Sequence, residues 1–142
     1  VGAHRYLRPL MDFGFEQMAD SNLKVIGVAS MSDAEKVPGS RTESALAVTG
    51  FDYQTALDYP LVTDVSLREA METSQGLISS SISAGPTGGL AYAGFYKVLE
   101  RECKAGRLED MMNAEGNIVP IISFIDTFLP YVELYDKVLG FH

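Results

Sequence analysis

The sequence has little of what metal-binding, disulfide-bonded or membrane-spanning proteins require. It contains one cysteine, Cys103, and two histidines, His4 and His142, at opposite ends. A single cysteine excludes an internal disulfide and favours a reducing, cytoplasmic location. The same shortage leaves no ligand set for a metal site built from sulfur and imidazole. No apolar run approaches the roughly 18 residues of a transmembrane helix, so we expect no membrane span.

Positive charge is also scarce. The chain has 11 Lys and Arg against 19 Asp and Glu, which gives a net charge of −8. This balance disfavours partners that need a basic surface, such as nucleic acid or an anionic membrane. Apolar residues make up 46% of the 142 residues, which is ordinary for a globular protein. We therefore expect residues 1–142 to form a single domain.

Short apolar runs alternate with helical patterns along the chain. The runs at residues 23–29, 61–64 and 118–125 show little polar alternation, which is typical of strands covered on both faces of a parallel sheet. Helical patterns occupy the first twenty residues, the stretch after residue 66, residues 88–104 and residues 126–138. This order predicts an α/β fold, with a mainly parallel sheet flanked by helices in a three-layer, Rossmann-like arrangement.

Two helices have specific sequence signals. Ser66, followed three residues later by Glu69, is a capping box and predicts a helix start. In the helix expected from Gly88 to Lys104, Cys103 lies beside the apolar stripe and is interpreted as a small packed hydrophobe.

The most informative stretch is residues 81–89, Ser-Ile-Ser-Ala-Gly-Pro-Thr-Gly-Gly. Glycines such as Gly85 allow close backbone approach to a ligand, and Ser83 and Thr87 place hydroxyls near the positive end of a helix dipole. On these residues alone, a tight turn with one hydroxyl as the helix N-cap is the simpler interpretation. Two other positions stay open in the same way. Arg41 is either a carboxylate ligand or a surface arginine, and Asp126 is either a functional residue after the last strand or a helix N-cap.

The order of these motifs resembles a known family. Gly-Leu-Ile at residues 76–78, then Ser-Ala-Gly at 83–85 before a small-residue helix, resembles the fold-type II pyridoxal-phosphate enzymes, the cysteine synthases and cystathionine β-synthases. Residues 1–7, 23–28 and 62–64 resemble successive upstream segments of that family. Asp126 and Tyr131 keep the spacing of the family's closing Pro-Asp…Tyr motif, although Ile125 replaces its proline. Pro86 with Gly88 and Gly89 departs from the family's usual helix start.

The resemblance implies a function and a division of roles. It implies that Ser83 hydrogen-bonds the pyridine nitrogen of pyridoxal 5'-phosphate, with Gly85, Thr87 and Asp126 beside the cofactor and Arg41 near the substrate carboxylate. It implies a lyase or transferase that performs β-elimination or β-replacement on a β-substituted amino acid, such as O-acetylserine, O-phosphoserine or serine. It also implies a homodimer as one candidate assembly.

The family's Schiff-base lysine and phosphate-binding glycine loop precede the segment that residues 1–7 resemble. We therefore interpret the chain as a fragment that lacks the N-terminal half, which the same or another chain would supply. No lysine present matches a catalytic position, so the chain alone is expected to be catalytically incomplete. All five are interpreted as solvated surface residues: Lys24, Lys36, Lys97, Lys104 and Lys137.

Two other functional classes remain open. The chain is alternatively a structural or regulatory domain, or one half of a split assembly. An unrelated α/β nucleotide-binding domain is the third interpretation, because the glycines at residues 85–89 follow a short run that contains Ile82.

Overall fold

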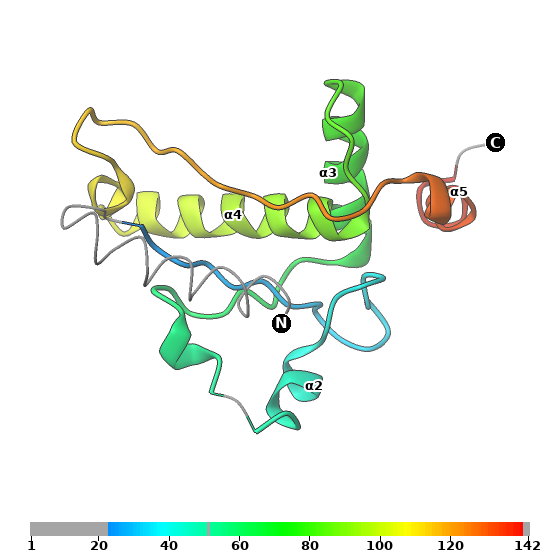
Figure 1. Cartoon of the computed structure of the whole chain (residues 1–142), viewed down its shortest axis with the longest axis horizontal. Helices are drawn as coiled ribbons and strands as arrows, with labels where there is room; N and C mark the ends of the chain where they lie inside the picture. Colours follow the sequence, from blue (N-terminus) through cyan, green and yellow to red (C-terminus); the bar gives the residue numbers. More distant parts are fainter. Residues whose placement is uncertain (1–22, 51, 141–142) are drawn as a thin grey trace.

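The computed structural model describes residues 23–50 and 52–140, and the helix predicted in the first twenty residues lies outside them. In the described part, helices and extended segments alternate (Figure 1). The elements in chain order are α2 (Glu43–Ala47), η1 (Gln54–Ala56), α3 (Leu67–Ser79), α4 (Pro86–Lys104), η2 (Leu108–Met111), η3 (Leu129–Tyr131) and α5 (Val132–Leu139). None of the described helices is long and apolar enough to cross a membrane.

Helix α3 begins where the sequence predicts it. The Ser66 hydroxyl accepts the Glu69 backbone N–H, and the Glu69 carboxylate accepts the Ser66 N–H, so the predicted capping box is confirmed. The helix continues to Ser79, through the Gly-Leu-Ile stretch that resembled an enzyme turn. Residues 76–78 are therefore the last helical turn of α3.

Helix α4 is the central element of the described structure. Gly85 is its N-cap and Pro86 its first residue, where the missing proline N–H is no loss. It ends at Lys104, as predicted, and Gly106 follows with φ of +70°. Gly89 allows α3 and α4 to touch, because a Cβ there would collide with the backbone carbonyl oxygen of Ala70. Cys103 is exposed, so its interpretation as a packed hydrophobe is wrong.

The predicted mainly parallel sheet is not formed. Within residues 23–50 and 52–140, strand pairing is limited to two isolated parallel bridges, Val28 with Val62 and Ser30 with Thr42. The Ala29 N–H donates to the Val62 carbonyl at 2.9 Å, and the Val62 N–H donates to the Gly27 carbonyl at 3.0 Å. The α/β, three-layer, Rossmann-like prediction is therefore wrong for this structure, whose regular elements are helices.

The error has a physical reason. Apolar runs predict burial, but a sheet also needs a neighbouring strand to take up backbone N–H and C=O groups. Only a few backbone hydrogen bonds join residues 23–30 to residues 58–62. Residues 118–125, the most apolar run, lie extended along α4 without any strand partner in the described structure (Figure 1).

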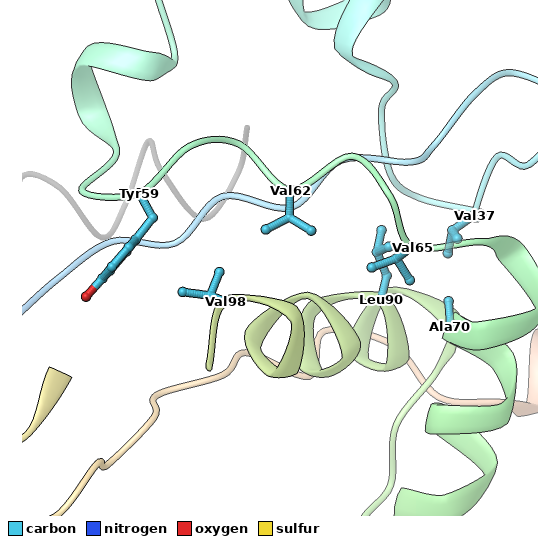
Figure 2. Close-up of a cluster of buried hydrophobic side chains, with 7 residues drawn as sticks. All are labelled: Val37, Tyr59, Val62, Val65, Ala70, Leu90 and Val98. Atoms are coloured by element: carbon cyan, nitrogen blue, oxygen red, sulfur yellow. The ribbon is translucent and has the colours of Figure 1, made fainter. Parts of the chain in front are cut away.

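The hydrophobic core lies between α4 and the extended segments before α3. Its members converge on one face of α4 (Figure 2): Val37, Tyr59, Val62, Val65, Ala70, Leu90 and Val98. Gly94 brings this face of α4 against residue 28, because a Cβ there would collide with the Val28 side chain.

The extended segments share a direction. In Figure 1, residues 23–30 and 117–126 both run opposite to α4, from its C-terminal end towards its N-terminal end. At the first end, the Lys24 ammonium donates to the Asp110 carbonyl at 2.8 Å. At the second, the Gly85 N–H donates to the Asp126 carbonyl at 3.0 Å. Both segments therefore end near the N-terminus of α4.

Candidate functional site

The candidate site is the turn between α3 and α4, at the end where the extended segments finish. Residues 80–85 connect the two helices, and Ser81 adopts a left-handed conformation with φ of +65°. The buried Ser74 hydroxyl donates to the Ala84 carbonyl at 2.9 Å and also contacts the Tyr135 hydroxyl from α5. The turn is thereby tied to the helix before it and to the last helix of the chain.

Asp126 closes the other side of the turn. Its carboxylate accepts the Thr87 hydroxyl at 2.8 Å, and its backbone carbonyl accepts the Gly85 N–H. A side chain at Gly85 would collide with the Asp126 carboxyl group, so glycine is required for this contact. Asp126 is not the N-cap of the last helix, since η3 and α5 are capped by Phe128 and Tyr131. The N-cap role is therefore wrong, and a functional role for Asp126 stays a prediction.

The structure thus brings together three of the five predicted site residues. Gly85, Thr87 and Asp126 form one hydrogen-bonded group, which we call the Asp126 latch. Ser83 lies on the same turn with its side chain exposed. Among the described residues, no hydrogen bond or ion pair links Arg41 to these four through its guanidinium. Its loop is nevertheless close, since a Cβ at Gly39 would lie 3.0 Å from the Thr87 methyl carbon.

The four predicted cofactor ligands differ in how well they fit a cofactor. The Thr87 hydroxyl and the Asp126 carboxylate are engaged with each other, and the Asp126 side chain fills the space above Gly85. Ser83 alone offers a hydroxyl that has no hydrogen-bond partner in the described structure. Ser83 therefore fits contact with a ligand atom, whereas the Asp126 latch fits a positioning role for the turn.

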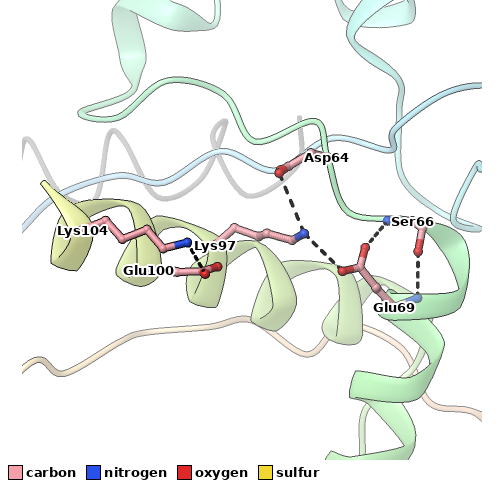
Figure 3. A network of polar contacts seen from close by, with 6 residues as sticks. All are labelled: Asp64, Ser66, Glu69, Lys97, Glu100 and Lys104. Atoms are coloured by element: carbon pink, nitrogen blue, oxygen red, sulfur yellow. Dashed lines mark hydrogen bonds and ion pairs between the residues drawn. The ribbon is translucent and has the colours of Figure 1, made fainter.

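A second polar cluster joins α4 to the start of α3, away from this turn (Figure 3). The Lys97 ammonium lies 3.2 Å from the Glu69 carboxylate and 3.9 Å from that of Asp64, and Lys104 pairs with Glu100 at 2.6 Å. The Lys97 side chain is 32% exposed, so it lies at the surface and is held in ion pairs there. A groove of about 670 Å³ beside this cluster is lined by residues 61–64 and the C-terminal half of α4.

The charges in this cluster are mutually stabilised. The hydrogen bond from the Ser66 backbone, together with Lys97, lowers the pKa of Glu69, and Glu69 in turn raises the pKa of Lys97. A raised pKa keeps the Lys97 amine protonated and unsuited to nucleophilic attack. Among the described residues, no group of three or more His, Cys, Asp or Glu side chains is placed to hold a metal ion.

Sequence reasoning missed two residues that shape the turn. Ser74 gives no signal of its own, apart from its place on the buried stripe of α3. Gly39 belongs to a recognisable Pro-Gly turn, but its packing against Thr87 joins residues far apart in the sequence. No protein-family model matches this chain, and no curated protein matches it.

Proposed function

We propose that this chain contributes the ring-contacting turn of a pyridoxal-phosphate site for β-elimination or β-replacement on a β-substituted amino acid. The observation that carries the proposal is Ser83, whose exposed hydroxyl is unpartnered on a turn otherwise held at Ala84, Gly85 and Thr87. A free hydroxyl on a fixed turn can donate to a ligand nitrogen without first breaking a bond within the protein.

Each residue of the turn has a separate role in this proposal. Ser83 holds a neutral donor against the pyridine nitrogen. The Asp126 latch keeps the Ser83 backbone in place and does not itself contact the pyridine ring of the cofactor. When bound, the cofactor would supply an electron sink, and a neutral hydroxyl donor at its pyridine nitrogen would make that electron sink weaker. Arg41 is the proposed contact for the substrate carboxylate, because its loop begins at Gly39 beside Thr87.

The proposal leaves the cofactor-binding lysine to polypeptide outside these 142 residues. The substrate class proposed is O-acetylserine, O-phosphoserine or serine. Lys97 and Lys104, the lysines nearest to a groove, are paired with carboxylates and lie away from the turn.

Ser83→Ala tests the proposal, with Ser81→Ala as its matched control. Both serines are exposed and lie on the same turn, but only Ser83 is assigned the contact. Pyridoxal phosphate is titrated into each purified protein, together with any polypeptide that copurifies, and binding is followed by absorbance and by calorimetry. We expect Ser83→Ala to bind about fivefold more weakly, the loss of one hydrogen bond, and Ser81→Ala to bind as the wild type does.

Equal binding by the two variants contradicts the role of Ser83. Absence of binding by the wild type in every purified form contradicts the cofactor itself. That second result would favour the structural or regulatory interpretation of the chain.

A further inference from the structure

One peptide unit of the candidate turn is held from both sides. The Ala84 carbonyl, on a fully buried residue, accepts the Ser74 hydroxyl at 2.9 Å. The N–H of the same peptide unit belongs to Gly85 and donates to the Asp126 carbonyl at 3.0 Å. A peptide unit is planar, so fixing both of its polar groups fixes its orientation.

Ser83 lies between this peptide unit and the end of α3. On its other side, the Ile82 N–H donates to the Leu77 carbonyl of α3 at 2.9 Å. The backbone N–H and C=O groups of Ser83 make no hydrogen bond to a described residue. The direction of the Ser83 side chain is therefore set by two flanking anchors. The first belongs to α3 alone, whereas the second, the 84–85 peptide unit, also depends on the end of the chain.

The Ser74 hydroxyl connects this peptide unit to α5. Ser74 is fully buried, and its Oγ also contacts the hydroxyl of Tyr135, which is 5% exposed. A serine hydroxyl has one proton, and Ser74 donates it to the Ala84 carbonyl. The Tyr135 hydroxyl is therefore the donor to Ser74. Two hydrogen bonds run in one direction, from Tyr135 to Ser74 to Ala84, and we call them the Tyr135 relay.

Tyr135 is suited to remain a donor. Burial, and after it the charge of Asp126, raise the pKa of Tyr135 above its ordinary value of 10.0, so the hydroxyl stays protonated at neutral pH. A donor to the Ser74 oxygen polarises the Ser74 O–H and strengthens its bond to the Ala84 carbonyl. Without the Tyr135 proton, the buried Ser74 oxygen would have no donor and the bond to Ala84 would weaken.

Docking of α5 depends on the same side chain. Tyr135 is the one buried residue of α5, which has eight residues and no side chain that caps its N-terminus. A helix of this length is not stable in water by itself. A second hydrogen bond joins it to α3, from the Arg68 guanidinium to the Val138 carbonyl, but this bond lies at the exposed surface. The buried contact between α3 and α5 is therefore made by Tyr135.

We propose that Tyr135 is a positioning residue for the turn that carries Ser83, and that it acts through Ser74. While α5 is docked, the Tyr135 relay holds the 84–85 peptide unit and the Ser83 hydroxyl keeps one direction. When α5 leaves α3, the Ala84 carbonyl loses this support and Ser83 is released. The benefit to a ligand at Ser83 rests on the function proposed above, whereas the coupling between α5 and the turn does not.

The carbonyl carbon shift of Ala84, measured by NMR on the intact protein, reports the hydrogen bond at this carbonyl in the folded state. Tyr135→Phe removes only the hydroxyl, so the Ala84 signal should move upfield as its hydrogen bond weakens. Ser74→Ala removes the bond and should move the signal further. Tyr131→Phe is the matched control, because it removes the same atom from a half-buried tyrosine whose hydroxyl has no hydrogen-bond partner among the described residues. It should leave the Ala84 signal in place.

The double variant tests whether Tyr135 acts through Ser74. In a protein that already carries Ser74→Ala, Tyr135→Phe should cause no further shift at Ala84. Amide hydrogen exchange tests the coupling to α5. In Tyr135→Phe, exchange at Gly85 in the turn and at Val138 in α5 should each become about fivefold faster, because one lost hydrogen bond loosens both. Exchange in Tyr131→Phe should match the wild type.

Pyridoxal phosphate is the probe for the link to Ser83. At about ten times its Kd or more, it should slow exchange at Gly85 and Val138 together by about tenfold, because a ligand that binds the docked form stabilises that form. Slowing at Gly85 alone would keep the cofactor and overturn the coupling to α5. No slowing at either amide, with the Ala84 shifts as expected, would contradict the proposed cofactor and support the relay.

Three further results would overturn the relay itself. The first is an unmoved Ala84 signal in Tyr135→Phe, and the second is an equal shift in Tyr131→Phe. The third is a double variant in which Tyr135→Phe adds its full shift to that of Ser74→Ala, since Tyr135 would then act on the turn by another route.

Discussion

The two flanks of α4 differ in how completely they are packed. On one flank, α3 and residues 23–30 press so closely that Gly89 and Gly94 have no room for a side chain. On the other, residues 118–125 cover the helix with one face and leave Val119, Ile121 and Ile125 in solvent. Both flanks are built from apolar sequence. Apolar side chains make a segment suitable for burial, but whether both of its faces are buried depends on neighbouring segments that pair with its backbone.

The largest effect is expected on the packed flank, from Gly89→Ala. Its new methyl group would meet the Ala70 carbonyl oxygen and the Ser74 side chain, so α3 and α4 must move apart. We expect the free energy of unfolding, measured by urea denaturation, to fall by about 2–3 kcal/mol. Gly76→Ala is the matched control, since nothing lies within 4 Å of a Cβ at this helical position. There the better helix former should add about 0.5–1 kcal/mol.

Equal effects of the two alanines would contradict the close approach of α3 and α4. A loss only at Gly89 would sharpen the comparison, because the two substitutions are chemically identical and differ only in their surroundings.

The sequence predicted elements whose signals are local. The Ser66 capping box and the end of α4 before Gly106 depend on residues a few positions apart, and the structure confirms both. The parallel sheet depended on distant strands finding one another, and apolar runs carry no information about pairing. The same limit applies to the candidate site. The turn at residues 81–89 was recognisable, but the bond between Thr87 and Asp126 spans 39 positions and gave Asp126 a different role from an N-cap.

A smaller effect is expected from the ion pair between Glu69 of α3 and Lys97 of α4. The Ser66 N–H and Lys97 lower the pKa of Glu69 below its ordinary value of 4.5. Because the pKa of Glu69 is lower in the folded state, the ionised carboxylate stabilises the fold at pH values above 4.5. This contribution is lost as the pH falls through the lower pKa of the folded state. Glu69→Gln removes it, so variant and wild type should differ near neutral pH and converge in acid, below pH 4.5.

The size of this difference is limited by exposure. The Glu69 side chain is 44% exposed, and water screens its attraction to Lys97, so we expect less than about 1 kcal/mol at neutral pH. Denaturation of both proteins between about pH 3 and 7 measures it. A difference that persists unchanged in acid would mean that Glu69 acts through packing and not through its charge.

The smallest effect is expected on the open flank. Threonine in place of Val119 and Ile125 together keeps β-branched side chains in the extended segment and puts hydroxyl groups into solvent. Because both side chains are already in water, the free energy of unfolding should change by no more than about 0.5 kcal/mol. A loss above about 1 kcal/mol would show that this face is covered in solution and would remove the contrast between the flanks. Unchanged stability would confirm that these two exposed side chains contribute nothing to folding, in contrast to the close contacts at Gly89.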